Sequence, residues 1–348
     1  MKEMMKAAKL YSIGEGMKID LVKVPKARVN DVLVDIRASG ICHSDLNYRD
    51  GLSPVGKLPI ILGHEIAGVV AAVGDDVEGI KIGNRVCVHY VVSCRHCLYC
   101  RTGRENFCEK YQMIGKDVDG GLAEYIAVPA VNVLKLPDAI PFEQGAIMGC
   151  AVSTAYHALK RGRVMPGETV VIYGVGGLGI HAVQLAARIF GAGKVIAVDV
   201  LDEKLKLAKK LGADEIINAA NDEPAKSIKT MTNAKLADVV LDFVGFRSTI
   251  EKGIECVGKS GRIVIAGLGK VEDITVSPYK SIIGKEMEII GVNDHYKSEL
   301  ATLIQLTSSG KLDLSNSVTH RVSLDDVNLG IEILEKKIGN PVRVVVVK

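Results

Sequence analysis

The sequence predicts an α/β protein in which a β-rich domain is joined to a doubly wound parallel sheet. Its 348 residues correspond to two domains, or three, at roughly 100–200 residues per domain. From Thr169 onward, short β-branched runs alternate with amphipathic helical stretches, an order typical of a parallel sheet with helices on both faces. The preceding residues show no regular alternation. Gly, Pro and Asp turns separate their strand-like runs, which favours a barrel-like β domain.

In the N-terminal part, three runs are expected to form strands: Val32–Ala38, Ile66–Val73 and Ala123–Val128. Residues 291–348 hold one helical pattern and a terminal strand, Val342–Val347, and this pattern alone does not decide which domain they join. No internal repeat or low-complexity linker interrupts the chain, so the domain boundary is expected within residues 150–167.

The C-terminal part divides into strands and helices in a regular order. Six runs are expected to be strands of the parallel sheet: Thr169–Tyr173, Lys194–Asp199, Glu215–Ile217, Asp238–Asp242, Arg262–Ala266 and Glu286–Ile290. A helix over Gly177–Phe190, ended by Gly191, joins the first two strands. Asp202 is expected to cap the N-terminus of the next helix and Gly212 its C-terminus, because apolar residues recur between them at helical spacing.

The composition excludes several classes of protein. The chain is 48% hydrophobic and 24% charged, as in globular proteins, and its 44 basic and 41 acidic residues leave a net charge of only +3. Few aromatic residues and no Trp argue against a nucleic-acid-binding role. No run approaches the roughly 20 apolar residues of a membrane span, and Met1–Leu10 lacks the apolar core of a signal peptide. We therefore expect a cytoplasmic protein.

The most specific local pattern is a cluster of four cysteines, Cys94-x2-Cys97-x2-Cys100-x7-Cys108. Four thiolates so close in sequence can enclose a tetrahedral metal ion, and a closed site of four sulfurs is typical of structural zinc. An iron–sulfur cluster is the rival, but the bacterial ferredoxin spacing ends in x3-Cys-Pro. Reduced thiols or a disulfide are the commonplace alternative. Nearby cations would offset the negative charge of the zinc site: Arg95, His96, Arg101 and Arg104.

A second pattern is a glycine loop, Gly174-Val-Gly176-Gly-Leu-Gly179, which follows an expected strand and opens an expected helix. In this context G-x-G-x-x-G is the fingerprint of dinucleotide binding, with the pyrophosphate at the helix N-terminus; a merely glycine-rich turn is the alternative. Asp199 ends the next strand at the expected distance. Its carboxylate would accept hydrogen bonds from the adenosine ribose and repel a 2′-phosphate, which favours NAD over NADP. The first following cation is Lys204.

A third, dispersed group consists of Cys42, His64 and Cys150, with Ser44 and Glu65 beside the first two. Taken singly, a cysteine or histidine is usually part of the core. Together, two thiolates and one imidazole would leave one coordination position of a zinc ion open, as in catalytic zinc sites. Sequence spacing does not by itself join these three residues.

These motifs resemble those of the zinc-dependent alcohol dehydrogenases of the medium-chain dehydrogenase/reductase superfamily. The most specific piece is Gly63-His64-Glu65-x2-Gly68-x5-Gly74, and the resemblance covers essentially the whole chain. It implies a GroES-like catalytic domain over residues 1–151 and 291–348 and a Rossmann NAD-binding domain over residues 152–290. The C-terminal segment would therefore return to the catalytic domain.

The resemblance also implies a role for each matching residue. Cys42, His64 and Cys150 would hold the catalytic zinc, with Glu65 close to the metal and Asp45 bonded to His64. Ser44 would exchange the substrate hydroxyl proton. Cofactor contacts would come from His43, Thr154, Gly174, Gly176, Gly177, Leu178, Gly179, Asp199, Lys204 and Arg343. Cys87 and Cys256 are left as buried thiols.

The resemblance implies an NAD-dependent zinc alcohol dehydrogenase with two zinc ions per chain, acting on a small alcohol, aldehyde or ketone, as a homotetramer or homodimer. Cys150 favours this branch over polyol dehydrogenases. One departure is Asn47, which stands where many members carry a relay histidine and which cannot accept a proton near neutral pH. Two alternatives remain: a zinc-independent enoyl or quinone reductase, and a zinc-stabilised module that binds nucleic acid or protein.

Overall fold

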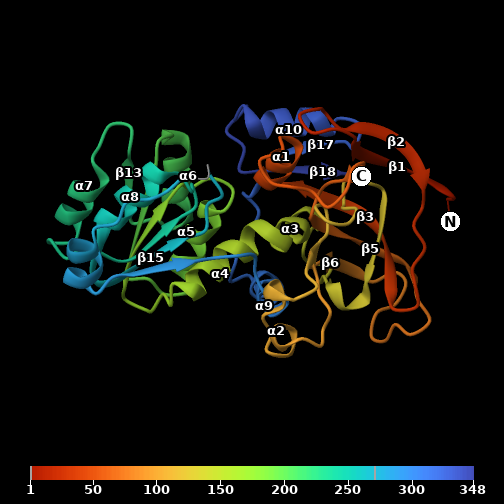
Figure 1. The fold of residues 1–348 in the computed structure, drawn as a ribbon, viewed down its shortest axis with the longest axis horizontal. Helices are drawn as coiled ribbons and strands as arrows, with labels where there is room; N and C mark the ends of the chain where they lie inside the picture. Colours follow the sequence, from red (N-terminus) through yellow and green to blue (C-terminus); the bar gives the residue numbers. More distant parts are fainter. Residues whose placement is uncertain (1, 270–271) are drawn as a thin grey trace. The chain divides into compact units, whose positions relative to one another are not determined.

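The computed structural model describes residues 2–269 and 272–348, and the chain divides into two compact units (Figure 1). The first unit combines Met1–Ser153 with His295–Lys348, and the second is Thr154–Asp294. The C-terminal residues therefore belong with the N-terminal strands, although a whole unit separates them in the sequence.

The first unit is built on a mixed seven-stranded sheet in which β3 is the central strand. The order is β10-β6-β5-β3-β18-β17, and β9 also pairs with β3. The bounds are β3 Asp31–Ile41, β5 Glu65–Val73, β6 Arg85–Val88, β9 Tyr125–Pro129, β10 Val133–Lys135, β17 Val318–Val322 and β18 Arg343–Val347. The three N-terminal strands and the terminal strand predicted from the sequence all overlap members of this sheet.

Two smaller sheets complete the β structure of this unit. One has the order β2-β1-β4, with β1 Met4–Leu10, β2 Lys18–Lys23 and β4 Ile60–Ile61. The other pairs β7 Val91–Val92 with β8 Gln112–Met113. Buried apolar side chains of the strands and of α10 form one continuous core.

The helices of the first unit range from single turns to the 12 residues of α9. They are α1 His43–Arg49, α2 Leu98–Arg101, η1 Glu105–Phe107, η2 Ala130–Asn132, α3 Phe142–Ile147, η3 Met148–Val152, α9 Lys297–Ser308 and α10 Val327–Glu335. The expectation of one helical pattern after residue 290 is wrong, because α9 and α10 are separate helices. Each buries its own apolar stripe, with Leu300 and Leu303 on α9 and Val327 and Ile331 on α10.

The second unit contains one parallel sheet of six strands in the order β13-β12-β11-β14-β15-β16. The strands are β11 Thr169–Tyr173, β12 Lys194–Asp199, β13 Glu215–Asn218, β14 Ala237–Asp242, β15 Val257–Ile265 and β16 Glu288–Gly291. The helices are α4 Ser153–Arg161, which begins at the unit boundary, α5 Gly179–Arg188, α6 Asp202–Leu211, α7 Pro224–Met231, α8 Arg247–Cys256 and η4 Pro278–Ile283. Strand order reverses between β11 and β14, which is the position where doubly wound sheets bind ligands.

The ends of α6 show one correct and one wrong prediction. Gly212 ends the helix with φ +123°, as expected. Leu201, not Asp202, is the N-terminal cap, and Asp202 is the first helical residue. The Asp202 carboxylate accepts a hydrogen bond from the Asn218 side-chain amide at 2.6 Å, so a side-chain partner takes the place of the expected backbone amide.

No helix within residues 2–269 and 272–348 combines the length and the apolar character needed to cross a bilayer.

Candidate functional site

Four potential metal ligands from distant parts of the chain meet in the first unit. Cys42 caps α1 at the end of β3, His64 and Glu65 lie at the start of the neighbouring strand β5, and Cys150 lies in the π-helical turn η3. One ligand atom from each lies within 4.8 Å of all the others, and all four residues are buried. Pairing of Gly40 with Glu65 between β3 and β5 brings the first two segments together.

The donor chemistry of this group fits zinc. His64 Nε2 and Glu65 Oε2 are buried and lack a hydrogen-bond partner of ordinary geometry among the described residues. Leaving such an atom unpaired costs about 1–3 kcal/mol, which an ion held at this place would offset. A hydrogen bond from Cys150 and the nearby His64 lower the pKa of Cys42 well below its usual value despite burial, so a thiolate is available here.

Asp45 connects the two ligand segments. Its Oδ2 accepts a hydrogen bond from the backbone N–H of Cys42 at 2.8 Å, and its Oδ1 accepts one from Gly63 at 3.2 Å. The same Oδ1 lies 3.5 Å from His64 Nδ1. Burial alone would lower the pKa of His64, but the Asp45 charge and the neighbouring Cys42 raise it well above its usual value. Asp45 therefore lies next to His64, but His64 Nδ1 has no hydrogen-bond partner of ordinary geometry among the described residues, so the hydrogen bond that the resemblance implies stays a prediction.

Behind the ligands, Glu65 Oε1 accepts a hydrogen bond from the Arg343 guanidinium in a fully buried ion pair. Arg343 reaches this place because β18 pairs with β3 next to β5. Burial raises the pKa of Glu65 to about 7, and the Arg343 charge opposes that rise. Arg343 Nε is buried and has no hydrogen-bond partner among the described residues.

Ser44 and His43 lie in the first turn of α1. Ser44 is half-buried with its Oγ 3.7 Å from Cys42 Sγ, whereas His43 is exposed. Asn47, one turn further, is half-buried, and its backbone carbonyl accepts hydrogen bonds from Leu52 and Ser53. Of these three, Ser44 is the one in contact with a potential ligand.

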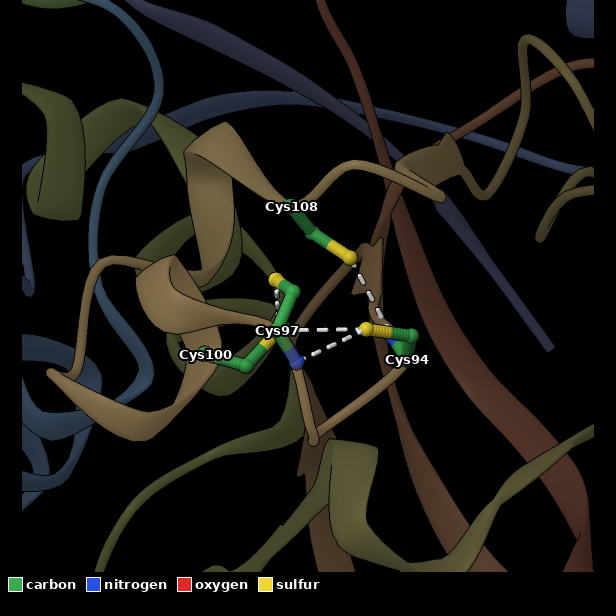
Figure 2. A group of neighbouring side chains, drawn as sticks. All are labelled: Cys94, Cys97, Cys100 and Cys108. Atoms are coloured by element: carbon green, nitrogen blue, oxygen red, sulfur yellow. Dashed lines mark hydrogen bonds between the residues drawn. The ribbon is translucent and has the colours of Figure 1, made fainter.

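The four clustered cysteines converge in a separate lobe of the first unit (Figure 2). Their sulfurs lie within 4.8 Å of one another. The backbone N–H groups of Cys94 and Lys110 donate to Cys108 Sγ at 3.1 and 3.3 Å, and that of Cys97 donates to Cys94 Sγ at 3.4 Å. Backbone donors lower the pKa of Cys97 to about 6. All eight cysteines are free thiols, and Cys87 and Cys256 are buried as predicted. The lobe fits a tetrahedral ion held by thiolates.

One of the cations expected around this lobe has another partner. The guanidinium carbon of Arg104 lies 5.3 Å from the centre of the Tyr99 ring. His96 Nδ1 lies 2.7 Å from the backbone oxygen of Cys94 and so contacts the lobe through the main chain.

In the second unit, the glycine loop lies between β11 and α5. Gly174 has φ +79°, and a Cβ on Gly179 would overlap the Gly174 carbonyl oxygen, so both positions require glycine. A Cβ on Gly176 would meet no atom within 4 Å, so the backbone there borders open space at the start of α5. This arrangement fits a dinucleotide pyrophosphate.

Asp199, at the end of β12, holds the glycine loop from the side. Its Oδ2 accepts a hydrogen bond from Val175 at 2.9 Å, and its Oδ1 accepts bonds from Val200 and Leu201 at 2.8 and 3.1 Å. Each carboxylate oxygen has two lone pairs, so Oδ2 can accept one further hydrogen bond, from a ribose hydroxyl.

The other expected cofactor residues of this unit lie on two helices and in the glycine loop. Leu178 precedes α5, Thr154 lies near the start of α4, and Lys204 is buried in α6. Gly177 offers its carbonyl oxygen to His181 Nδ1 at 2.8 Å.

Two residues near these sites, Asp242 and His295, are not among the site residues predicted from the sequence. Asp242 ends β14 beside β11; its Oδ1 accepts hydrogen bonds from Val244 and Gly245, and its buried Oδ2 has no partner among the described residues. An acidic residue at a strand end before a glycine is the signal that could have found it. The other is His295, whose ring packs on Tyr90 near His64. No local sequence pattern connects His295 with Tyr90 or His64.

Comparison with known proteins agrees with this geometry. The family described as "Alcohol dehydrogenase GroES-like domain" matches residues 28–138, and "Zinc-binding dehydrogenase" matches residues 177–309. The chain is 39% identical to an alcohol dehydrogenase of Geobacillus stearothermophilus over 93% of this chain and 95% of the relative. It is 34% identical to an NAD-dependent alcohol dehydrogenase of Sulfurisphaera tokodaii over 98% of this chain and 100% of the relative.

A solved structure shows the same similarity in three dimensions. The alcohol dehydrogenase of Aeropyrum pernix superimposes with a TM-score of 0.89 at 35% identity, covering 99% of this chain and 100% of that one.

Proposed function

Because the chain belongs to the zinc-dependent alcohol dehydrogenase family of the medium-chain dehydrogenase/reductase superfamily, we propose that it is an NAD-dependent zinc alcohol dehydrogenase. It would transfer hydride between a primary or secondary alcohol and NAD+, and would reduce the matching aldehyde or ketone in reverse. The observation that carries this proposal is the buried set of Cys42, His64, Glu65 and Cys150. With Glu65 held by Arg343, the two thiolates and one imidazole would leave a fourth zinc position open to the substrate.

Both proposed zinc sites lie in the first unit, and the glycine loop proposed to bind NAD+ lies in the second. Catalytic zinc would be held by Cys42, His64 and Cys150, with Glu65 kept behind them by Arg343. Structural zinc would be enclosed by the four clustered cysteines. When bound, zinc supplies a Lewis acid that favours loss of the alcohol proton, and NAD+ accepts the hydride.

Several residues of this chain would handle the proton and the cofactor. Ser44, beside Cys42, would accept the hydroxyl proton of the substrate and pass it on. Asn47 cannot accept it, so the proton would leave through cofactor hydroxyls or water. The backbone around Gly176 would receive the pyrophosphate, and Asp199 would bind the adenosine ribose and disfavour a 2′-phosphate. His43, Thr154, Leu178, Lys204 and Arg343 complete the proposed cofactor contacts.

A substrate panel with both nucleotides tests the function. Purified protein is assayed for reduction of NAD+ and NADP+ by primary and secondary alcohols and for oxidation of NADH by aldehydes and ketones, and its zinc is counted. We expect two zinc ions per chain and turnover with NAD+. Zinc-loaded protein that reduces neither nucleotide would contradict the proposal. Enoyl or quinone reduction that survives Cys42→Ser would favour the zinc-independent alternative.

We also propose that the protein works in the cytoplasm as a homotetramer, with a homodimer as the alternative. None of the eight cysteines forms a disulfide, which suits a reducing compartment. The edge strand β16 carries the exposed Ile289, and η4 carries the exposed Tyr279 and Ile283, a combination that favours contact with a second copy. Light scattering gives the mass, and Ile289→Glu should lower it. An unchanged mass would remove β16 from the interface.

A further inference from the structure

A cluster of three buried rings adjoins the proposed ligand His64. The centre of the Tyr90 ring lies 5.3 Å from that of His64, with the two planes at 81°, so the rings meet edge to face. Tyr90 is 2% exposed and His64 is fully buried. Tyr90 follows β6 and precedes the four-cysteine lobe, so it reaches His64 from a different segment than Asp45 does.

Two further histidines enclose Tyr90. The His89 ring lies 5.9 Å from the Tyr90 ring in a nearly parallel arrangement, and the His295 ring meets Tyr90 edge to face at 5.1 Å. His89 and His295 also contact each other at 4.9 Å. Both histidines are at most 1% exposed. The Tyr90 ring therefore has little room to tilt away from His64.

The backbone on both sides of this cluster is held by hydrogen bonds. The buried Asn132 side chain donates to the carbonyls of His89 and Val91 at 2.7 Å each, and His89 N–H donates to the Asn132 carbonyl at 2.7 Å. Near His295, the Lys297 N–H donates to Glu105 Oε1 at 2.6 Å. Because the segments that carry His89 and His295 are each held by separate hydrogen bonds, the positions of the rings depend on more than their packing against one another.

His64 needs such support because its polar contact is long. Asp45 Oδ1 lies 3.5 Å from His64 Nδ1, beyond the usual hydrogen-bond range, and this nitrogen has no other hydrogen-bond partner among the described residues. Rotation about the Cβ–Cγ bond would then carry Nε2 away from the two cysteine sulfurs. An edge-to-face contact has a preferred geometry and restricts that rotation.

We propose that Tyr90 is a positioning residue that sets the ring plane of His64, and that His89 and His295 hold Tyr90 in place. This inference rests on the proposed metal centre, because a fixed imidazole matters only if it is a ligand. Tyr90 acts through its ring, so phenylalanine should replace it and an aliphatic side chain should not.

Cadmium substitution provides a readout besides activity. Protein loaded with ¹¹³Cd should give two ¹¹³Cd resonances, one from the four-thiolate lobe and one from the site of two thiolates and one imidazole. In Tyr90→Leu the second resonance should move or broaden while the first stays as an internal reference. Tyr90→Phe should keep both resonances. Release of zinc from the second site to a chelator should accelerate roughly tenfold in Tyr90→Leu and stay unchanged in Tyr90→Phe.

Two other variants separate positioning from general loss of packing. Tyr48→Leu removes another buried tyrosine of the same unit, one that contacts Met113, and should leave both resonances in place. His295→Leu and His295→Phe repeat the comparison one ring further out, in case Tyr90→Leu does not fold. The leucine variant should shift the second resonance and the phenylalanine variant should restore it.

The results distinguish this inference from the function on which it rests. A single resonance from wild-type protein would contradict the catalytic metal centre itself. Two resonances that are unaffected by both Tyr90→Leu and His295→Leu would leave the metal centre intact and overturn the positioning role. A shift of equal size in Tyr48→Leu would also overturn it, because the effect would then be one of packing.

Discussion

The carboxylate of Glu65 and the guanidinium of Arg343 form a buried ion pair although 278 residues separate them in the chain. Glu65 begins β5, and Arg343 begins the terminal strand β18. The ion pair therefore links β18, the C-terminal strand, to the start of β5 directly behind the proposed catalytic zinc site. Two charges so deeply buried are stable only together, because either one alone would be left without solvent or a partner.

Removing one member of this pair should be strongly destabilising. Arg343→Met leaves Glu65 buried without its counter-charge, which should lower the free energy of unfolding by about 3–5 kcal/mol. Adding Glu65→Gln should recover part of that loss, with a coupling energy of about 2 kcal/mol. Urea unfolding of the two single variants and the double variant measures both.

The control for this prediction is an exposed ion pair of the same unit. Arg321 and Glu143 lie 2.6 Å apart near the surface, and Arg321→Met should cost less than about 1 kcal/mol. Equal decreases in the free energy of unfolding for Arg343→Met and Arg321→Met would contradict the prediction that the buried pair contributes more to stability than the exposed one.

The two proposed zinc sites should separate by mutation. Cys42→Ser should lower the zinc content from two ions to one and abolish turnover, while thermal stability changes little. Cys97→Ser should also remove one zinc but mainly lower the melting temperature, because a closed four-thiolate site stabilises the fold without touching substrate. Elemental analysis, calorimetry and turnover are compared on the same preparations. Full turnover with a single zinc in Cys42→Ser would reverse the assignment.

Ser44 should be needed for proton transfer. Ser44→Ala removes the hydroxyl beside Cys42 and should lower kcat about 10²–10⁴-fold, the usual contribution of a positioned acid–base group. Ser44→Thr keeps the hydroxyl and should retain most of the rate. Steady-state kinetics at saturating NAD+ measures both, and zinc content should equal that of wild type. A small effect of Ser44→Ala would mean that the proton leaves by another route.

Asp199 should control cofactor choice. Asp199→Gly removes the charge that repels a 2′-phosphate, so the ratio of kcat/KM for NAD+ over NADP+ should fall at least about tenfold. The variant also loses the bonds from Val175, Val200 and Leu201, so some weakening of both nucleotides is expected. Asp199→Asn keeps one carbonyl acceptor without the charge and separates the two effects. A wild-type preference for NADP+ would contradict the assignment.

Acid stability should depend on His89. Burial lowers the pKa of His89 to about 4, from 6.5 in the unfolded chain. Above pH 6.5 the residue is neutral in both states; as the pH falls towards 4 the unfolded chain binds the proton first, so up to about 3 kcal/mol of stability is lost. His89→Phe keeps a ring in the cluster and should flatten the fall of unfolding free energy between pH 6.5 and 4. Parallel curves for variant and wild type would contradict this.

Much of the fold follows from local pattern. The predicted strands Thr169–Tyr173 and Lys194–Asp199 agree with β11 and β12 residue for residue, because buried parallel strands are short apolar runs with sharp polar ends. The start of α6 differs from the prediction by one residue, because the Asp202 carboxylate accepts a hydrogen bond from the Asn218 side chain and Asp202 does not cap the helix. After residue 290 the structure has two helices, α9 and α10, where the sequence pattern predicts one, and residues 309–326 with β17 lie between them.

The sequence by itself determined the features that depend on residues close together in the chain. These are the glycine loop with its strand and helix, and the cluster of four cysteines between residues 94 and 108. The short spacing of these cysteines already limits how far apart their sulfurs can lie. The meeting of Cys42, His64 and Cys150 was expected only from a family resemblance. The tertiary structure decided that meeting, the burial of Arg343 against Glu65, and the contact of His295 with Tyr90. These contacts depend on strand pairing and core packing between distant segments, which no local periodicity encodes.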